Sequence, residues 1–183
     1  MNNVMVDIET LGTGQNTVVL SIALVRFNER TEGEDLHIKF NRHEVRQQVE
    51  KGRIIDPDTV MWWLRQDSDA QKAITETYNS DFSRDMEVAL GQVLAFIKPD
   101  DIVWANPPSF DIAILEDLMR DFNMPCLIKK HYNVRDLRTM KKVLGASPKP
   151  ENFIAHDALH DCMQQIRDLR AGLDRVGMLR AIA

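Results

Sequence analysis

Val4-Met5-Val6-Asp7-Ile8-Glu9 is a short apolar run that ends in two carboxylates. Its composition predicts a buried strand. Side chains two positions apart on a strand project from the same face, so Asp7 and Glu9 form a rigid pair of oxygen ligands suited to a hard divalent cation. An Asp-x-Glu pair is also typical of an ordinary solvated strand end, so the pair by itself leaves both interpretations open.

Two more strands are expected directly after this one. Leu11 to Gly14 predicts a turn, and the β-branched, apolar run from Val18 to Phe27 predicts a central strand. A polar turn from Asn28 to Glu34 follows, and the alternating apolar residues of the range 36–40 predict a half-buried third strand. Three strands joined by short turns form an antiparallel meander.

The rest of the chain is expected to alternate helices with strands. Asp56-Pro57 is a helix-start signal, and Ser109 is the expected N-cap of a later helix. The predicted helices cover residues 56–64, 68–77, 82 or 83 to 97, 110–122, 137–144 and 157–179, and the predicted strands cover residues 101–105 and 132–134. This order predicts an α/β fold with one mixed five-stranded sheet flanked by helices, in a single domain of residues 1–183.

Charge and composition limit the classes of function. The 183 residues carry a net charge of −5, whereas a protein that coats nucleic acid through its overall field is usually basic. Any nucleic-acid contact is therefore expected from a local patch, and a metal site would use part of the acidic excess. Cys126 and Cys162 are too few for a disulfide framework, and no segment resembles a signal peptide or the ~20 apolar residues of a membrane span, so we expect a cytoplasmic protein with no membrane contact.

Asp111 follows the predicted strand 101–105 and opens a helix. The helix dipole favours an acid in the first turn, which is a sufficient structural explanation. However, this strand is expected to run parallel to the first one, so that its C-terminal end lies beside Asp7 and Glu9. That edge is where ligands bind in open α/β sheets.

The segment Ala155-His156-Asp157-Ala158-Leu159-His160-Asp161 allows two interpretations. In the first, His156 and His160 bind zinc from one helix face and Asp157 acts as base, but Asp is shorter than the Glu of such motifs and no third ligand follows. In the second, His156 precedes the helix and serves as general base, while Asp161 points from the helix into the acidic cluster. We favour the second.

Three motifs therefore occur in order: Asp7-x-Glu9, Asn106-x-x-x-Phe110-Asp111 and His156-x-x-x-x-Asp161. Together they resemble the DEDDh 3′–5′ exonucleases, which have an RNase H-like fold, and the resemblance spans nearly the whole chain. Within that family the chain is most similar to the DexA-type bacteriophage exonucleases, through residues 7–12, 62–63, 109–111, 135–139 and 155–162. Pro107-Pro108 departs from the family pattern, and because proline lacks a backbone donor, amide contacts of this loop are not carried over.

The resemblance implies a metal-dependent reaction. Asp7 would bridge two Mg²⁺ or Mn²⁺ ions, Glu9 and Asp161 would complete the site of the nucleophilic water, Asp111 would support the second ion, and His156 would deprotonate the water. Two cations ~4 Å apart can stabilise the attacking and the leaving oxygen of a phosphodiester. The expected reaction is hydrolysis of nucleic acid from a free 3′ end to nucleoside 5′-monophosphates.

The substrate and its surroundings are less defined. Single-stranded DNA is the favoured substrate, with an exoribonuclease as the first alternative and a non-catalytic nucleic-acid-binding module on the same fold as the second. The motif spacings favour an exonuclease over an RNase H-type endonuclease. A phage-encoded protein would act in the host cytoplasm, and a homodimer stays open.

Substrate contacts are expected around this site. The resemblance places the terminal nucleotide at the Thr10 main chain and the Leu11 side chain, beside Asn106 and Phe110. Plain core packing is the alternative for Leu11 and for Phe110, and for Phe110 the two interpretations are evenly balanced. Trp62 and Trp63 are candidates for base stacking, and since neighbours on a helix diverge, at most one can be buried while the other faces the site. The candidate phosphate contacts are basic: Arg135 and Arg138 first, then Lys141, Lys142, Arg42, His43, Arg46, Lys51 and Arg53.

Overall fold

A five-stranded sheet in the order β3-β2-β1-β4-β5 forms the centre of the molecule, which we describe from a computed structural model over residues 2–80 and 85–183. The strands are β1 (Asn3–Thr10), β2 (Val19–Phe27), β3 (Glu32–Lys39), β4 (Ile102–Ala105) and β5 (Val134–Asp136). Strand β1 pairs antiparallel with β2 and parallel with β4, while β2 and β3 are antiparallel and β4 and β5 are parallel. The predicted meander and the predicted mixed five-stranded sheet are confirmed.

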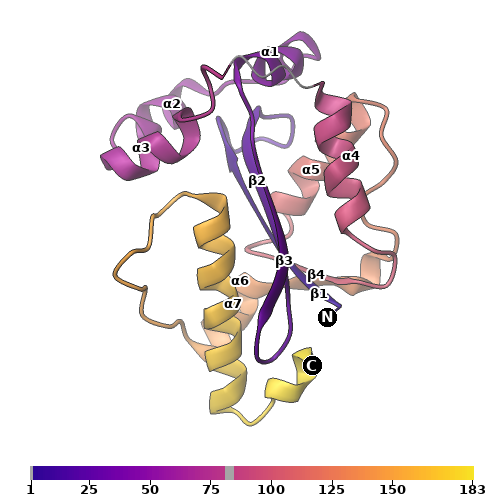
Figure 1. Ribbon diagram of the computed structural model, residues 1–183, viewed down its shortest axis with the longest axis vertical. Coiled ribbons are helices and arrows are strands. Elements are labelled where there is room, and N and C mark those ends of the chain that lie inside the picture. Colours follow the sequence, from indigo (N-terminus) through magenta and orange to yellow (C-terminus); the bar gives the residue numbers. More distant parts are fainter. Residues whose placement is uncertain (1, 81–84) are drawn as a thin grey trace.

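Helices cover both faces of this sheet. Figure 1 shows α4 and α5 on one side, α6 and α7 on the other, and α1, α2 and α3 grouped at one end. The helices are α1 (Arg42–Glu50), α2 (Pro57–Trp63), α3 (Ser68–Thr75), α4 (Met86–Phe96), α5 (Asp111–Asp121), α6 (Leu137–Leu144) and α7 (Ala158–Arg175), with short 3₁₀ helices η1 (His131–Asn133) and η2 (Leu179–Ile182). Within the described ranges, none of these helices has the length and apolar character that crossing a membrane would require.

Strand β1 contributes to two separate cores because its side chains alternate. Val4, Val6 and Ile8 lie in the apolar core on the α4 and α5 side of the sheet. Met5 lies in a second core with residues of α7, including Cys162. Asp7 and Glu9 continue the face of Met5. The alternation therefore directs both carboxylates towards α7.

The end of β1 is free of parallel strand pairing. Its register with β4 covers only Asn3 to Met5, where Met5 lies opposite Trp104. The antiparallel register with β2 shifts between Glu9 and Thr10, as in a β-bulge. Bulges often terminate pairing or re-aim a side chain next to an active site. The chain after Met5 is thus open on one side to the loop that follows β4.

The structure corrects three predictions about individual elements. Helix α1 was not predicted, although Asn41 and Glu44 form its capping box. Ser109 is not the N-cap of α5, since that position belongs to Phe110. Strand β5 begins two residues later than expected, after η1.

The last helix was predicted to reach Leu179 but ends at Arg175. Gly177 has φ of 69° and donates its amide to Asp174, and the Met178 amide donates to Leu173, which is a Schellman motif. The expected start of the third predicted helix at Phe82 or Ser83 lies outside the described residues.

Candidate active site

Four carboxylates converge between β1, α5 and α7. Asp7 and Glu9 come from β1, Asp111 from the first turn of α5 and Asp161 from the first turn of α7. The charges of Asp111, Glu9 and Asp161 all act on Asp7, which shows that the acids form one electrostatic cluster. The three segments that carry them are far apart in the sequence.

Asp111 is held at the open side of β1. Its Oδ1 accepts a hydrogen bond from the amide of Ile8 at 3.3 Å, between Asp7 and Glu9 in the strand. Its Oδ2 accepts from the amide of Asn106 at 3.3 Å. The carboxylate thus takes the place of a strand partner for β1, because a buried amide needs an acceptor. The bond from the Asn106 amide also closes the loop between β4 and α5.

His156 and Asp161 are also joined through the backbone. The amide of His156 donates to Asp161 Oδ2 at 2.9 Å, and His156 has φ of 61°, so it lies before α7 and not within it. Asp157 is the N-cap of α7, accepting from the amides of Leu159 and His160. His160 is turned away to Ile154, whose amide donates to its Nδ1 at 3.0 Å. The paired-histidine zinc interpretation therefore fails, and His156 lies in the loop as the second interpretation expects.

The electrostatics of the cluster oppose ionisation in the absence of a cation. Burial raises the pKa of Asp7 well above its ordinary value, and the surrounding carboxylates add to this. Burial also raises the pKa values of Glu9 and Asp161, and it raises the pKa of Asp111 to about 7 despite the opposing hydrogen bonds from Asn106 and Ile8. Like charges held this close need a positive partner to ionise together.

This donor set fits a divalent cation. Glu9, His156 and Asp161 each offer one ligand atom, and these atoms lie within 4.8 Å of one another. Carboxylate oxygens favour Mg²⁺ or Mn²⁺ over softer metals. The repulsion among the acids gives a physical reason for a cation to bind here.

Trp62 and Trp63 have divergent positions, as expected for neighbours on a helix. Trp63 is buried, and its indole N–H donates to the carbonyl of Thr10 at 2.9 Å. Trp62 is 41% exposed. Its ring meets the imidazole of His156 edge-on, with centroids 4.8 Å apart, and Trp63 also contacts that imidazole, at 5.8 Å. The two indoles therefore form one wall around His156.

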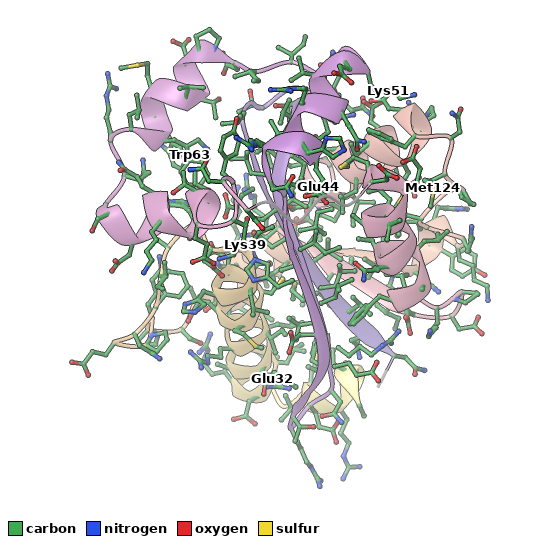
Figure 2. All side chains as sticks on the ribbon, turned by 45° about the horizontal axis from the view of Figure 1, so that its top comes forward. Glu32, Lys39, Glu44, Lys51, Trp63 and Met124 are labelled. Atoms are coloured by element: carbon green, nitrogen blue, oxygen red, sulfur yellow. The ribbon has the colours of Figure 1, made fainter. Side chains whose placement is uncertain are left out.

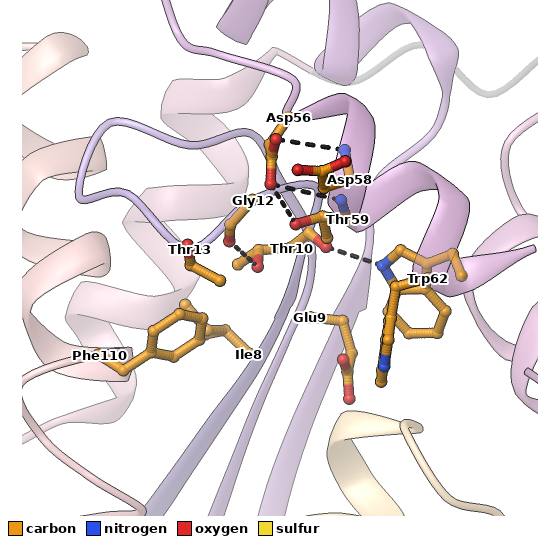
Figure 3. Close-up of a pocket in the computed structure, with 11 residues that line it drawn as sticks. Ile8, Glu9, Thr10, Gly12, Thr13, Asp56, Asp58, Thr59, Trp62 and Phe110 are labelled. Atoms are coloured by element: carbon orange, nitrogen blue, oxygen red, sulfur yellow. Dashed lines mark hydrogen bonds between the residues drawn. The ribbon is translucent and has the colours of Figure 1, made fainter. Parts of the chain in front are cut away.

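A largely apolar cleft of about 430 Å³ opens beside Glu9. Figure 3 shows Phe110 on one side of it, Trp62 on the other, and Glu9 between them. Asp56, Asp58 and Thr59 line its far rim together with Thr13. Its volume lies within the usual range of small-molecule pockets, and its lining combines apolar side chains with a few polar groups.

Four further candidates for substrate contact differ in how near they lie to the cleft. Phe110 lines the cleft and also packs partly on the core, so both of its interpretations stay open. Leu11 packs against that core and is not part of the cleft lining. Arg138 is exposed and donates to the carbonyl of Asn106 at 3.1 Å, at the edge of the site. Arg135 is exposed and donates to the carbonyls of Tyr132 and Val134.

Arg53 was predicted as a candidate phosphate contact at the surface, and that prediction was wrong. It is buried, its Nε donates to Thr17 O at 2.7 Å, and it forms ion pairs with Asp117 and Asp121. These two ion pairs connect the loop that precedes α2 with helix α5. Its role is structural.

Two site residues were missed from the sequence. Gln165 donates its side-chain N–H to Asp7 Oδ1 at 2.6 Å. Lys39, on β3, forms an ion pair with Asp157 at 3.1 Å. Gln165 lies four residues after Asp161, so helical spacing was a usable signal for it. Nothing local to Lys39 indicated its partner.

The mixed sheet and the four converging carboxylates define a 3′–5′ exonuclease of the DEDD type, with an RNase H-like fold. The model of the Rv2179c-like 3′–5′ exoribonuclease domain matches residues 2–173. The chain belongs to this Rv2179c-like family, and it is accordingly a nuclease.

Individual relatives agree with this assignment. The chain is 26% identical over 214 residues to an exodeoxyribonuclease of Enterobacteria phage T4, covering 94% of this chain and 89% of that protein. Solved structures with the same fold include E. coli ExoI in complex with single-stranded DNA (TM-score 0.67, 18% identity, 97% of this chain) and exonuclease I from Methylocaldum szegediense (TM-score 0.66, 17% identity, 97% of this chain). The chain spans 41% of the length of each of these two proteins.

Proposed function

We propose that this protein removes nucleotides one at a time from a free 3′ end by a two-metal mechanism, with single-stranded DNA as its substrate. The observation that carries the proposal is the convergence of Asp7, Glu9, Asp111 and Asp161 beside His156 and an apolar cleft. Exonucleolytic cutting needs a reacting centre and a terminal-nucleotide site side by side. The acidic cluster and the apolar cleft, which share Glu9, would serve as these two parts.

The side chains of Asp7, Glu9, Asp111 and Asp161 would hold the metal ions. When bound, Mg²⁺ or Mn²⁺ supplies charge stabilisation for the attacking and leaving oxygens. His156 would accept a proton from the attacking water, because its imidazole lies with Glu9 and Asp161 in one group of ligand atoms. Trp62 and Trp63 would hold that imidazole in place.

The terminal nucleoside would occupy the cleft. Trp62 offers an exposed indole face for base stacking, which is tolerant of base identity, and Phe110 closes the opposite side. Arg138, beside Asn106, would contact a phosphate of the incoming strand. The name of the T4 relative and the single-stranded DNA complex of E. coli ExoI support DNA as the substrate.

RNA is the second candidate, because the matched family is described as an exoribonuclease domain. The test is a time course on 5′-labelled DNA and RNA of one sequence, single-stranded and duplex, with MgCl₂ or EDTA. A ladder that shortens from the 3′ end only with metal is expected, faster on single-stranded DNA. If RNA were shortened faster than DNA, RNA would replace DNA as the proposed substrate. Internal cuts would overturn the exonuclease mechanism.

Variants assign the site in the same assay. Asp161→Asn and His156→Ala should abolish shortening while leaving the protein folded. Asp174→Asn is the matched control, since Asp174 is an exposed acid near the other end of α7. Full activity in either site variant would contradict the assignment.

A further inference from the structure

The side chain of Gln165 lies directly behind the acidic cluster. It projects from α7 one turn after Asp161 and is 4% exposed. Its Nε2 donates to Asp7 Oδ1 at 2.6 Å, which is a short and therefore strong bond to a carboxylate. No described residue donates to the other oxygen, Asp7 Oδ2.

Chemistry fixes the orientation of this amide. A carboxylate must be ionised to bind a cation, and an ionised carboxylate only accepts hydrogen bonds, so in the metal-binding state the NH₂ group of Gln165 must face Asp7. Its carbonyl oxygen, Oε1, then points the other way, where it is buried without a hydrogen-bond partner among the described residues. A buried unpaired carbonyl destabilises the folded state. The amide is therefore poorly explained by the stability of the fold.

We infer that Gln165 is a positioning residue of the metal centre: its N–H fixes the rotation of the Asp7 carboxylate so that Oδ2 is presented to the cation. The inference rests on the proposed metal-dependent function. Residues that hydrogen-bond to metal ligands commonly change metal affinity by about 10–100-fold when they are replaced. Gln165 meets that description through a single, directed bond.

Gln164 is a natural comparison on the same helix. It is 5% exposed, and its Oε1 is likewise buried without a partner among the residues described. Its Nε2, however, donates to Asp168 Oδ1 at 2.9 Å and to Ser147 O at 3.2 Å, away from the acidic cluster. Two adjacent buried glutamines thus differ mainly in which group they hold.

The experiment measures Mn²⁺ binding by calorimetry to the full chain, together with thermal unfolding in EDTA. Gln165→Met keeps the length of the side chain and removes the donor, and Gln164→Met is the matched control. Gln165→Leu repeats the test with a second apolar side chain, in case one variant folds poorly. Asp7→Asn supplies the reference in which the ligand itself is changed.

We expect Gln165→Met to weaken Mn²⁺ binding by about tenfold or more, with little change in the unfolding midpoint of the metal-free protein. Gln164→Met should do the reverse, lowering the midpoint and leaving Mn²⁺ affinity intact. Wild-type affinity in both Gln165 variants would overturn the inference, as would an equal loss in Gln164→Met. If wild-type protein bound no Mn²⁺, or Asp7→Asn bound it equally well, the proposed metal site itself would fall.

Discussion

Lys39 connects the edge strand β3 to the N-terminal end of α7, the helix that carries Asp161. Its Nζ lies 3.1 Å from Asp157 Oδ2 and 2.7 Å from Glu76 Oε1. Figure 2 shows Lys39 near the N-terminal end of α7, at the opposite end of β3 from Glu32. Asp157 caps α7 next to His156, so Lys39→Met tests how the loop that carries His156 is anchored.

The structure sets the size of the effect. Breaking a fully buried ion pair costs about 3–5 kcal/mol, because one charge remains buried and unpaired. The Lys39 and Asp157 side chains keep 14% and 9% of their exposure, and Asp157 retains the amides of Leu159 and His160. We therefore expect Lys39→Met to lower the free energy of unfolding by about 2 kcal/mol, or about 4–8 °C in the midpoint.

The loss should depend on pH in a defined direction. Burial acts to raise the pKa of Asp157, but hydrogen bonds from the His160 amide and from Lys39 outweigh it and hold the pKa below its usual range. A lowered folded-state pKa contributes stability above the unfolded value of about 3.9, and that stability is lost as pH falls through the folded value. The difference between wild type and Lys39→Met should thus be largest at neutral pH and narrow below about pH 4.

Urea unfolding in EDTA at pH 7.5 and at about pH 3 measures both quantities. Glu76→Gln is the control, because Glu76 is the more exposed partner and its loss should cost less than about 1 kcal/mol. Asp157→Asn keeps an N-cap and removes the charge, so the double variant with Lys39→Met should recover most of the loss. A Lys39→Met effect equal to that of Glu76→Gln, or independent of pH, would refute this reasoning.

Three further predictions concern the site. Metal-free protein should lose thermal stability as pH rises from about 4 to 8, because burial raises the pKa of Asp111 to about 7 and the folded state then binds more protons than the unfolded state. In a series of melting curves, saturating MgCl₂ should remove this decline. A decline that persists with MgCl₂ would contradict the metal site. In a fluorescence titration, Trp62→Ala should weaken binding of a single-stranded oligonucleotide by about 5–150-fold, because the stacking of one base is lost. Trp62→Phe should retain most of the affinity. Unchanged binding by Trp62→Ala would exclude the stacking role. Arg138→Ala should weaken binding at all sequences and reduce the slope of log affinity against log salt by about 1, and an unchanged slope would exclude a phosphate contact.

Most of the fold was accessible from local patterns. Helix α6 was predicted at its observed bounds, and the helix-start signal at Asp56-Pro57 correctly marked the start of α2. The errors fell where local signals compete. Helix α1 is short and polar, so it lacks the apolar periodicity that predicts a helix, and its capping box at Asn41 was not enough to reveal it. The end of α7 was set by Gly177, a C-terminal signal that the longer apolar pattern obscured.

The four acids and the histidine of the proposed site could be named from the sequence alone, whereas Gln165 and Lys39 were missed. Strand alternation places Asp7 and Glu9 on one face, and helical spacing relates Asp161 to Gln165, because both periodicities are properties of the local backbone. The order of three short motifs then identified the class of nuclease.

Only the tertiary structure decided how those groups are held. Asp111 replaces a strand partner for Ile8, Trp63 binds the Thr10 carbonyl, and Lys39 pairs with Asp157 across the edge of the sheet. These contacts join residues between 53 and 118 positions apart, as for Thr10 and Trp63 or Lys39 and Asp157. No local periodicity encodes them, because they depend on packing distances between whole elements. The identity of the acids is thus a local property of the chain, whereas their orientation is a property of the fold.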